Sequence, residues 1–402
     1  MTYTILDIGI LPGAQSTNAF GINNSRQIVG CCTYPNGETH AFVWDQTNGM
    51  QDISLANAPN SQALAINTMG QIAGASNYAF MNPNDLAVLS ATLWTNNAVS
   101  ELVVDVNGSA AQSINVSGVA ACNVGTNNQN YSAKLSSAGL VPLGPVGPGP
   151  GVMSSYGNGI NDMGQVVGAI QVDAAGDTHA ALWDSAGNMQ DLGTSGDSST
   201  ALAINNAQMV VGEFHLNSSA RGFVWMPNVP GMRDLNPGGP AFSPFGLNAR
   251  GDVVGINAGN GLAGIILSGG TVQDLNPLVP AGSPQLQIAK GIDDSGDIIA
   301  WSTSGAVTRS YLLVPVPIKH PRAQPVVNRC GNLLARYLQL NADIGQRELN
   351  LSNLGWTPAR IAQDPSVSAL SEAIASLSTE MTNIGCPPPT LIKLPPVADR
   401  QP

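Results

Sequence analysis

The sequence predicts an all-β protein: a seven-bladed β-propeller of four-stranded blades closed by the N-terminal strand, followed by a small C-terminal α-helical hairpin. Three observations lead to this prediction. A short motif recurs with a period of about 45 residues, and each copy holds four short apolar runs. The chain also begins with one apolar run of the kind that the last copy lacks.

The repeat is anchored by an Asn that ends the first apolar run of each copy, as in "AFGIN", "ALAIN" and "GNGIN". The anchors recur every 43–48 residues, at Asn23, Asn67, Asn115, Asn161, Asn205 and Asn248, with Asp293 in the seventh place. In "NDMG" and "NARG" a Gly follows three residues later. An Asn side chain that bonds its own backbone opens a tight turn, and Gly accepts the positive φ that closes it. We therefore expect these anchors to be structural, the alternative being a row of carboxamide ligands.

Each of the first six copies contains four apolar runs bounded by Gly, Asn, Asp and Pro; in the fifth copy they are "ALAIN", "QMVVG", "GFVW" and "MRDLN". Runs this short are typical of strands, and four strands per period are typical of propeller blades. The seventh copy ends after its third run, and its missing fourth run matches "YTILDIG" at Tyr3–Gly9. We predict that this N-terminal strand pairs with Tyr311–Val316, because closure removes an exposed sheet edge.

The composition agrees with short strands and tight turns. The 402 residues include 45 Gly and 28 Pro, whereas charged residues make up 10% and aromatic residues 5%. A net charge of −11 without runs of Lys or Arg argues against nucleic acid or an anionic membrane surface as a partner. No apolar stretch is long enough to predict a membrane span.

The motif "HAFVW", which begins at His40, occurs together with the elements "GQVVG" and "MQDLG". In these elements the chain resembles the bacterial HAF-repeat family, an extracellular repeat family named for that tripeptide. The resemblance covers Tyr3 to about Pro317, and the third and seventh copies depart from it most. It implies a secreted or surface-exposed protein without an agreed enzymatic activity. The N-terminus lacks the features of a signal peptide. We therefore expect an extracellular or periplasmic protein whose signal is absent from this chain, with the cytoplasm as the alternative.

Three kinds of residue recur at fixed places in the repeat. An acidic residue stands in the fourth run at Asp7, Asp52, Glu101, Asp191, Asp234 and Asp274, with Pro142 as the exception. A Trp stands in the third run at Trp44, Trp94, Trp183 and Trp225. A His opens the third run at His40 and His179. We interpret the acids as edge charges that block aggregation, the Trp residues as packing between blades, and the His residues as structural. The functional alternatives are cation binding, ligand stacking and acid–base or metal chemistry.

Function should then come from residues that break the repeat. The largest breaks are the predicted loops Ala75–Ser90, Gly144–Ser155 and Glu213–Arg221. We expect all three on one face, because variable loops on a rigid scaffold often carry recognition; tolerated surface insertions are the alternative. The predicted binding residues on this face are Tyr78, Phe80, His215 and Arg221.

The chain changes character after the propeller. The predicted divisions are a propeller at 1–317, a Pro-rich linker at 318–328, a helical hairpin at 329–386 and a Pro-rich tail at 387–402. Two apolar stripes with helical spacing predict the hairpin. Cys330 and Cys386 flank the stripes, where the two ends of a hairpin meet, so we expect a disulfide there. Cys31, Cys32 and Cys122 lie in second runs and are expected to be buried thiols.

The sequence holds no G-x-S-x-G, H-E-x-x-H or phosphate-binding glycine motif, and Asp173–Asp177 only weakly resembles a calcium loop. We predict a noncatalytic ligand- or protein-binding module without cofactor or metal, whose partner is a small molecule, a glycan or a protein. The alternative is a lyase, hydrolase or isomerase with its site at the mouth of the central channel. A converging cluster of His, Arg and carboxylate at that mouth would indicate the enzyme.

Overall fold

The computed structural model describes residues 2–55, 60–77, 89–96, 98–102, 108–125, 129–143, 154–217, 219–227, 229–267, 271–316, 344, 357–364, 367–372 and 374–375. The chain divides into two compact units, Met1–Pro317 and Ile318–Pro402, and each is described by itself.

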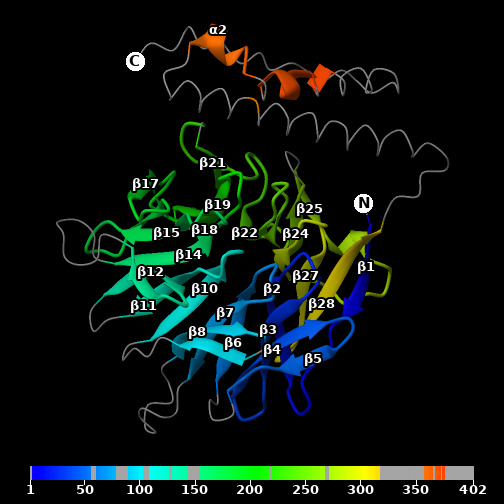
Figure 1. Ribbon diagram of the computed structural model, residues 1–402. Helices are drawn as coiled ribbons and strands as arrows, with labels where there is room; N and C mark the ends of the chain where they lie inside the picture. Colours follow the sequence, from blue (N-terminus) through cyan, green and yellow to red (C-terminus); the bar gives the residue numbers. More distant parts are fainter. Residues whose placement is uncertain are drawn as a thin grey trace. The chain divides into compact units, whose positions relative to one another are not determined.

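The first unit is a ring of seven four-stranded antiparallel sheets, the blades of a β-propeller (Figure 1). Blade 1 holds β2 (Ser16–Ile22), β3 (Ile28–Thr33), β4 (Thr39–Asp45) and β5 (Gly49–Asp52). Blade 2 holds β6 (Ser61–Ile66), β7 (Ile72–Asn77), β8 (Leu89–Thr95) and β9 (Ala98–Leu102). Blade 3 holds β10 (Ser109–Ile114), β11 (Ala120–Gly125), β12 (Asn130–Ser136) and β13 (Gly139–Pro142). Blade 4 holds β14 (Ser155–Ile160), β15 (Val166–Gln171), β16 (Thr178–Trp183) and β17 (Met189–Gly193).

The remaining blades follow the same plan, and the predicted all-β, seven-bladed architecture is confirmed. Blade 5 holds β18 (Ser198–Ile204), β19 (Val210–Leu216), β20 (Ser219–Trp225) and β21 (Arg233–Asp234). Blade 6 holds β22 (Phe242–Leu247), β23 (Val253–Asn257), β24 (Leu262–Ile266) and β25 (Val272–Asp274), followed by the 3-10 helix η1 (Asn276–Leu278). Blade 7 holds β26 (Ile288–Ile292), β27 (Ile298–Ser304), β28 (Val307–Val316) and, from the start of the chain, β1 (Thr2–Asp7).

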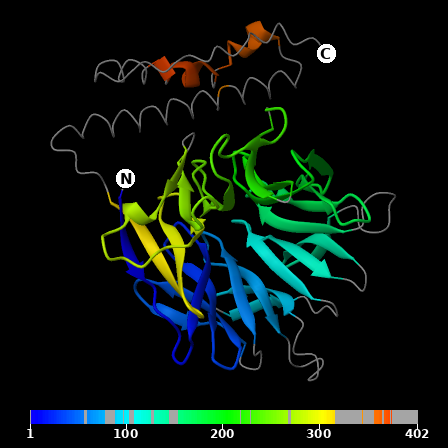
Figure 2. The ribbon, with the colours of Figure 1, turned by 180° about the vertical axis from the view of Figure 1, so that it is seen from behind.

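The N-terminal strand closes the ring. β1 pairs antiparallel with β28, from Thr2 opposite Val316 to Asp7 opposite Tyr311. The blue strand β1 lies beside the yellow strand β28 in Figure 1, and the opposite view in Figure 2 shows the same neighbours. The predicted closure is therefore confirmed, and it gives the outer edge of β28 a hydrogen-bonded partner.

The repeated Asn builds the turn between the first and second strands of each blade. In blade 2, Asn67 Oδ1 accepts the backbone N–H groups of Met69 and Gln71 at 3.0 and 2.9 Å. Gly70 follows with φ +77°, in the left-handed region that favours glycine. The structural role predicted for these Asn residues is confirmed. Two blades place a non-glycine residue at the left-handed position, Arg26 and Gln208, each with φ +59°.

The core lies in the seams, a term used here for the packing interfaces between neighbouring blades. Between blades 1 and 2, the buried Trp94 packs with Val43 and Ile53. Its Nε1–H donates to the carbonyl oxygen of Ile53 at 2.9 Å. We call the Trp residues at this repeat position of the third strands the Trp column. Its other members are buried as well: Trp44, Trp183 and Trp225. Their predicted role in packing between blades is confirmed.

In the second unit the described residues include the short helix α2 (Pro358–Ile361) and a helical stretch at 367–372. Ile361 and Val367 pack together. The first stripe of the predicted hairpin consists of Leu333, Tyr337, Leu340 and Ile344, and the second of Leu370, Ile374, Leu377, Met381 and Ile384. Only Ile344, Leu370 and Ile374 are among the described residues, and Cys330 and Cys386 lie outside them. Among the helices that are described, none is long and apolar enough to cross a membrane.

The cysteines of the propeller are buried free thiols, as predicted. They are Cys31, Cys32 and Cys122. Burial raises the pKa of the Cys31 and Cys122 thiols to about 12, so neither forms a thiolate at neutral pH. Their role in the propeller is that of small apolar side chains.

Candidate functional site

The repeated Asn residues also link the blades to one another around the channel. In six blades the Asn Nδ2 donates to the carbonyl oxygen of the corresponding residue in the next blade, at 2.8–3.3 Å. We call this set the asparagine ring: Asn23, Asn67, Asn115, Asn161, Asn205 and Asn248, with Asp293 in the seventh place. These bonds join every pair of successive blades from blade 1 to blade 7.

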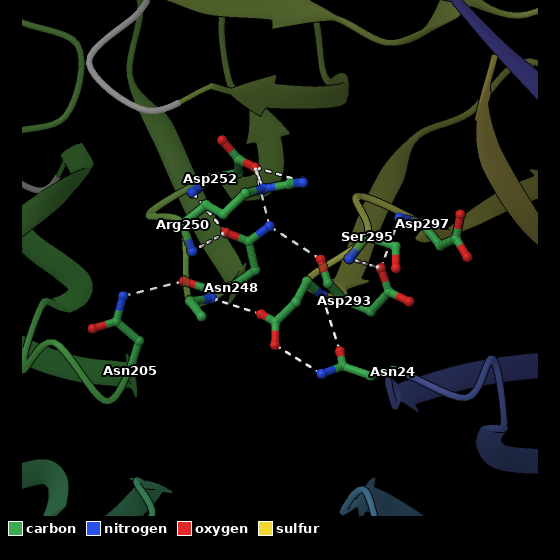
Figure 3. A network of polar contacts seen from close by, with 10 residues as sticks. Asn24, Asn205, Asn248, Arg250, Asp252, Asp293, Ser295 and Asp297 are labelled. Carbon is green, nitrogen blue, oxygen red and sulfur yellow. Dashed lines mark hydrogen bonds and ion pairs between the residues drawn. The ribbon is translucent and has the colours of Figure 1, made fainter. Parts of the chain in front are cut away.

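The seventh member, Asp293, lacks the amide donor of the other six. Its Oδ1 accepts the N–H groups of Ser295 and Asp297 at 2.8 and 2.9 Å (Figure 3). Its Oδ2 is buried without a hydrogen-bond partner, and the residue is only 4% exposed. Burial raises the pKa of Asp293, and the nearby Asp297 carboxylate raises it further against the opposing effect of the Asp297 N–H. A ring bond from Asp293 to blade 1 could therefore form only with a protonated carboxyl, because a carboxylate has no donor.

A polar hollow of about 250 Å³ lies at the turn end of the channel, lined by the asparagine ring and by the residue on either side of each member. Asp162 Oδ2 accepts Asn206 Nδ2, and Asp294 Oδ2 accepts Asn24 Nδ2, both at 2.8 Å. The other oxygen of each carboxylate accepts a backbone N–H from the preceding blade. Each of these two carboxylates therefore forms hydrogen bonds to both neighbouring blades.

The hollow does not contain the cluster that would indicate an enzyme. Its lining residues include carboxylates but neither His nor Arg. Among the residues that the structure describes, no group of three or more His, Cys, Asp or Glu side chains could hold a metal ion. Asp173 Oδ1 instead accepts the N–H groups of Gly176 and Asp177, so the weak calcium-loop pattern builds a hairpin turn.

Deeper in the channel, every innermost strand carries a β-bulge three residues before the ring Asn. A bulge leaves one residue unpaired and re-aims its side chain. We call these residues the bulge ring: Phe20, Leu64, Gln112, Asn158, Leu202, Phe245 and Lys290. All seven are half-buried, and all are flanked by Ala, Gly, Ser or Pro. Chemically different side chains thus occupy one height of the ring within an otherwise repeated motif.

Lys290 is the cation of the bulge ring. Its Nζ lies 4.5 Å from the centroid of the Phe245 ring, the bulge residue of the preceding blade. Phe20, the bulge residue of blade 1, follows Lys290 in the ring. Its side chain packs edge-on against Trp301 of blade 7, with 5.6 Å between the ring centroids. No carboxylate among the described residues forms an ion pair with Lys290. Burial lowers the pKa of its ammonium group.

A second cavity, of about 770 Å³, lies in the seam between blades 5 and 6. It is lined by turn residues of both blades and by the ends of their third and fourth strands. Its apolar lining residues include Met209, Val224, Met226, Leu235, Pro237, Val253 and Ile266. This volume is in the range of small-molecule sites in proteins.

Blade 6 departs from the Trp column beside this cavity. Ile266 pairs with Val253 in blade 6, just as Trp94 pairs with Ile72 in blade 2, so the two side chains occupy the same repeat position. Trp94 packs in the seam between blades 1 and 2, whereas the smaller Ile266 packs in a core cluster with Val211 and also lines the cavity. The sequence already held this signal, because "GIIL" stands where the preceding blade has "GFVW".

Arginine and aspartate side chains surround this cavity. Arg250 is paired with Asp252 at 3.0 Å, and Asp234 is paired with Arg221 at 2.6 Å. Arg233 is exposed, and none of the described carboxylates forms an ion pair with it. The paired charges cancel, so Arg233 gives the cavity rim a net positive charge.

The structure corrects the sequence prediction for His215 and Arg221. Both lie within strands, since β19 and β20 pair as far as Leu216 and Ser219, and the predicted loop Glu213–Arg221 is therefore a tight hairpin. His215 is exposed, and its Nδ1 lies 3.3 Å from Ser198 Oγ. Tyr78 and Phe80, like most of the loops Ala75–Ser90 and Gly144–Ser155, lie outside the described residues.

Arg221 also occupies a repeat position after all. It stands two residues before the partner of Asp234, as His40 does for Asp52 and His179 for Asp191. Its guanidinium donates to Asp234 and to the carbonyl oxygens of Asn236 and Gly239. The two His residues contact their aspartates in the same way, at 2.8 and 2.9 Å.

The acidic residues of the outer strands make a repeated backbone contact that the sequence analysis did not predict. Asp52 Oδ1 accepts the N–H of Ser54 at 2.9 Å, two residues along the chain. The same contact recurs at four further acids of these strands, Asp7, Asp191, Asp234 and Asp274. These five acids hold the chain where it leaves a blade, and their role in protecting the sheet edges stays a prediction.

Comparisons with known proteins support the fold. No protein-family model and no curated protein sequence matches the chain. Its structure is similar to that of streptogramin B lyase, with a TM-score of 0.52 at 9% identity, covering 78% of this chain and 98% of that one. It is also similar to an oligogalacturonate lyase from Vibrio parahaemolyticus, with a TM-score of 0.51 at 11% identity, covering 78% and 94%. The β-propeller domain of the Trilobed protease from Pyrococcus furiosus, which has an open velcro topology, gives a TM-score of 0.54 at 9% identity, covering 77% and 100%. At such identities the likeness shows the propeller fold alone.

Proposed function

We propose that this protein is a noncatalytic binding propeller that holds a sugar acid in its central channel. The observation that carries the proposal is the bulge ring, where side chains of five kinds (Phe, Leu, Gln, Asn and Lys) occupy one position of a repeat whose neighbouring residues are Ala, Gly, Ser or Pro. Residues at the repeated positions are explained by folding. The bulge residues are half-buried on the innermost strands, and variation at one such position of a repeat favours a binding function.

The chemistry of the bulge ring suits an acidic saccharide. The aromatic rings of Phe20 and Phe245 belong to the two blades next to Lys290 and offer apolar faces to a sugar ring. Gln112 and Asn158 belong to blades 3 and 4. Asn158 Nδ2 donates to the Ala201 carbonyl oxygen at 2.9 Å, and the amide oxygens of both residues can accept hydrogen bonds from hydroxyl groups. Lys290 is half-buried, and a bound carboxylate would compensate the cost of holding its charge there.

The test uses the small number of lysines in the chain, which are Lys134, Lys290, Lys319 and Lys393. Reductive methylation with carbon-13 formaldehyde gives one NMR signal for each lysine, and the signal missing from Lys290→Arg protein identifies Lys290. We expect glucuronate to shift this signal with saturation, whereas uncharged glucose at equal concentration leaves it in place. We also expect Lys290→Met protein to lose most glucuronate binding by calorimetry.

Lys134 is the internal control, because its Nζ donates to the carbonyl oxygens of Asp184 and Ser185, away from the channel. Equal shifts at Lys134 and Lys290, or no shift at Lys290, would contradict the proposal. The same spectra test the enzymatic alternative, because turnover would convert the glucuronate signals into those of a product.

We infer further that the chain is an exported member of the HAF-repeat proteins. The support is the motif "HAFVW" at His40, whose His contacts Asp52 in the folded blade, and the related pair formed by His179 and Asp191. An exported protein would form the Cys330–Cys386 disulfide. Mass spectrometry of a non-reduced digest should show the two peptides joined, and two free thiols in oxidised protein would count against export.

A further inference from the structure

We propose that the cavity between blades 5 and 6 is a second ligand site, which takes a hydrophobic anion: an apolar body bearing one carboxylate or sulfonate. This site is separate from the central channel, and it does not depend on the sugar-acid proposal. Its opening is on the turn side of the propeller, between the turn Ala249–Gly251 and the outer strand β21.

The first argument concerns the shape of the seam. The repeat fills the corresponding space between blades 1 and 2 with Trp94, and its other Trp residues are buried at the same position. Ile266, which is 5% exposed, packs in a core cluster with Val211 of blade 5, but it is smaller than Trp, and a cavity of about 770 Å³ lies beside it. An apolar void loses packing and hydrophobic contacts, so an apolar ligand that fills this one restores contacts that Trp makes elsewhere.

The second argument concerns the lining. Met209 and Met226 reach the cavity from blade 5, and Val253 and Ile266 reach it from blade 6. Methionine side chains are flexible and polarizable, so they adapt to apolar ligands of different shapes. The body of the ligand is therefore expected to be hydrocarbon rather than hydroxylated.

The third argument concerns charge. Asp234 is engaged by Arg221, and Asp252 engages Arg250, so these four charges are paired. Arg233 remains at the rim, exposed and without an ion pair to any described carboxylate. A guanidinium binds carboxylate and sulfonate groups through paired hydrogen bonds, which favours an anionic head over a neutral one.

The experiment uses the fluorescent hydrophobic anion anilinonaphthalene sulfonate as probe. We expect saturable fluorescence enhancement with the full-length protein at one site. Ile266→Trp places the repeat's own residue in the cavity, and it should abolish the enhancement while keeping or raising the melting temperature. Arg233→Gln changes only an exposed side chain and should weaken binding about tenfold.

Arg309→Gln, which alters an arginine of β28 in blade 7, is the matched control and should bind like the parent. Unchanged probe binding in both Ile266→Trp and Arg233→Gln would overturn the proposal, and the second variant keeps the test valid if the first fails to fold. Glucuronate shifts at Lys290 should persist in Arg233→Gln protein, so failure at one site is distinguishable from failure at the other.

Discussion

The seam between blades 1 and 2 and the seam between blades 5 and 6 join the same two surfaces of the repeat, yet one is filled and the other is hollow. Trp94 crosses the first seam and donates to the Ile53 carbonyl, whereas Ile266 leaves a cavity of about 770 Å³ in the second. Another repeat position differs too. Ser61 accepts the N–H of Ala41 across the first seam at 2.9 Å, whereas Phe242 replaces that serine in the second.

Both seams nevertheless keep the bond of the asparagine ring. Asn23 Nδ2 donates to the Asn67 carbonyl at 2.9 Å, and Asn205 Nδ2 donates to the Asn248 carbonyl at 3.1 Å. The turn holds each Asn through its own backbone contacts, so this link does not depend on how the seam is packed. A closed ring can therefore leave one seam hollow and still hold its blades in place.

The most damaging change would remove the closure that keeps both seams in one ring. Deleting the first nine residues takes away β1 together with the buried Tyr3 and Ile8. We expect a loss of roughly 5 kcal/mol or more, because two buried apolar side chains and a strand edge become exposed. Chemical denaturation measures the loss.

A chain that lacks only Met1 and Thr2 serves as the control, since it retains Tyr3, Ile8 and most of the β1 pairing. A nine-residue truncation that melts like the parent would refute the role assigned to closure.

The next change converts the filled seam into a hollow one. Trp94→Ile copies the residue of blade 6 into blade 2, and we expect it to reduce the free energy of unfolding by about 2–4 kcal/mol through cavity formation. Ile266→Leu keeps the volume of blade 6 nearly constant and should change stability little. A loss below about 1 kcal/mol for Trp94→Ile, measured by urea denaturation, would mean that the Trp column does not account for the difference between the seams.

The smallest change tests the remaining link of the asparagine ring. Asp293→Asn supplies the amide that blade 7 lacks, and we expect it to add about 1 kcal/mol of stability at neutral pH by donating to the Asn23 carbonyl. Blade 6 shows that such an Asn fits beside an aspartate, because Asn248 Nδ2 donates to Asp252 Oδ2 at 3.0 Å.

This gain should depend on pH. Burial raises the pKa of Asp293 in the folded protein, so the native state holds this proton to higher pH than the unfolded chain does. The contribution of Asp293 to stability is therefore present at low pH, and it is lost as the pH rises from about 3.9 through the raised value. The stabilising effect of Asp293→Asn should grow over the same range. Charged groups of the neighbouring turns, Asp294, Asp297, Arg26, Arg250 and Asp252, are common to both proteins.

The measurement is the difference in melting temperature between Asp293→Asn and the parent from pH 4 to pH 8. Asn161→Asp provides the reciprocal control, since it removes a donor from blade 4 and should destabilise more as the pH rises. An NMR titration of the carboxyl carbons of the parent provides a second measurement. A difference in melting temperature that stays constant from pH 4 to pH 8, together with no carboxyl carbon that titrates with a raised pKa, would rule out the protonated Asp293.

Much of the fold was predictable because it is local and repeated. The Asn turn, the short apolar strands and the missing outer strand of the seventh copy are each visible within a few residues of sequence. Seven repetitions make the pattern unambiguous, and the orphan strand at Tyr3–Gly9 determines how the ring closes. The Trp column was interpreted correctly for the same reason, because a large apolar side chain at a repeated strand position has to be buried between blades.

Contacts between repeats could not be read from the sequence. Arg221 looked unique because its slot in blades 1 and 4 holds His, and only the strand register shows that all three face an aspartate of the outer strand. The bulge ring was overlooked because alternation along a strand does not reveal which residue a bulge leaves unpaired. Whether Asp293 Oδ2 finds a hydrogen-bond partner depends on the neighbouring blade. The cavity at Ile266 depends on the side chains of two blades, because residues of blades 5 and 6 line it. The sequence by itself determined the blades and their number, because hydrogen bonding and turn geometry act locally, whereas the tertiary structure alone decided which departures from the repeat meet in space.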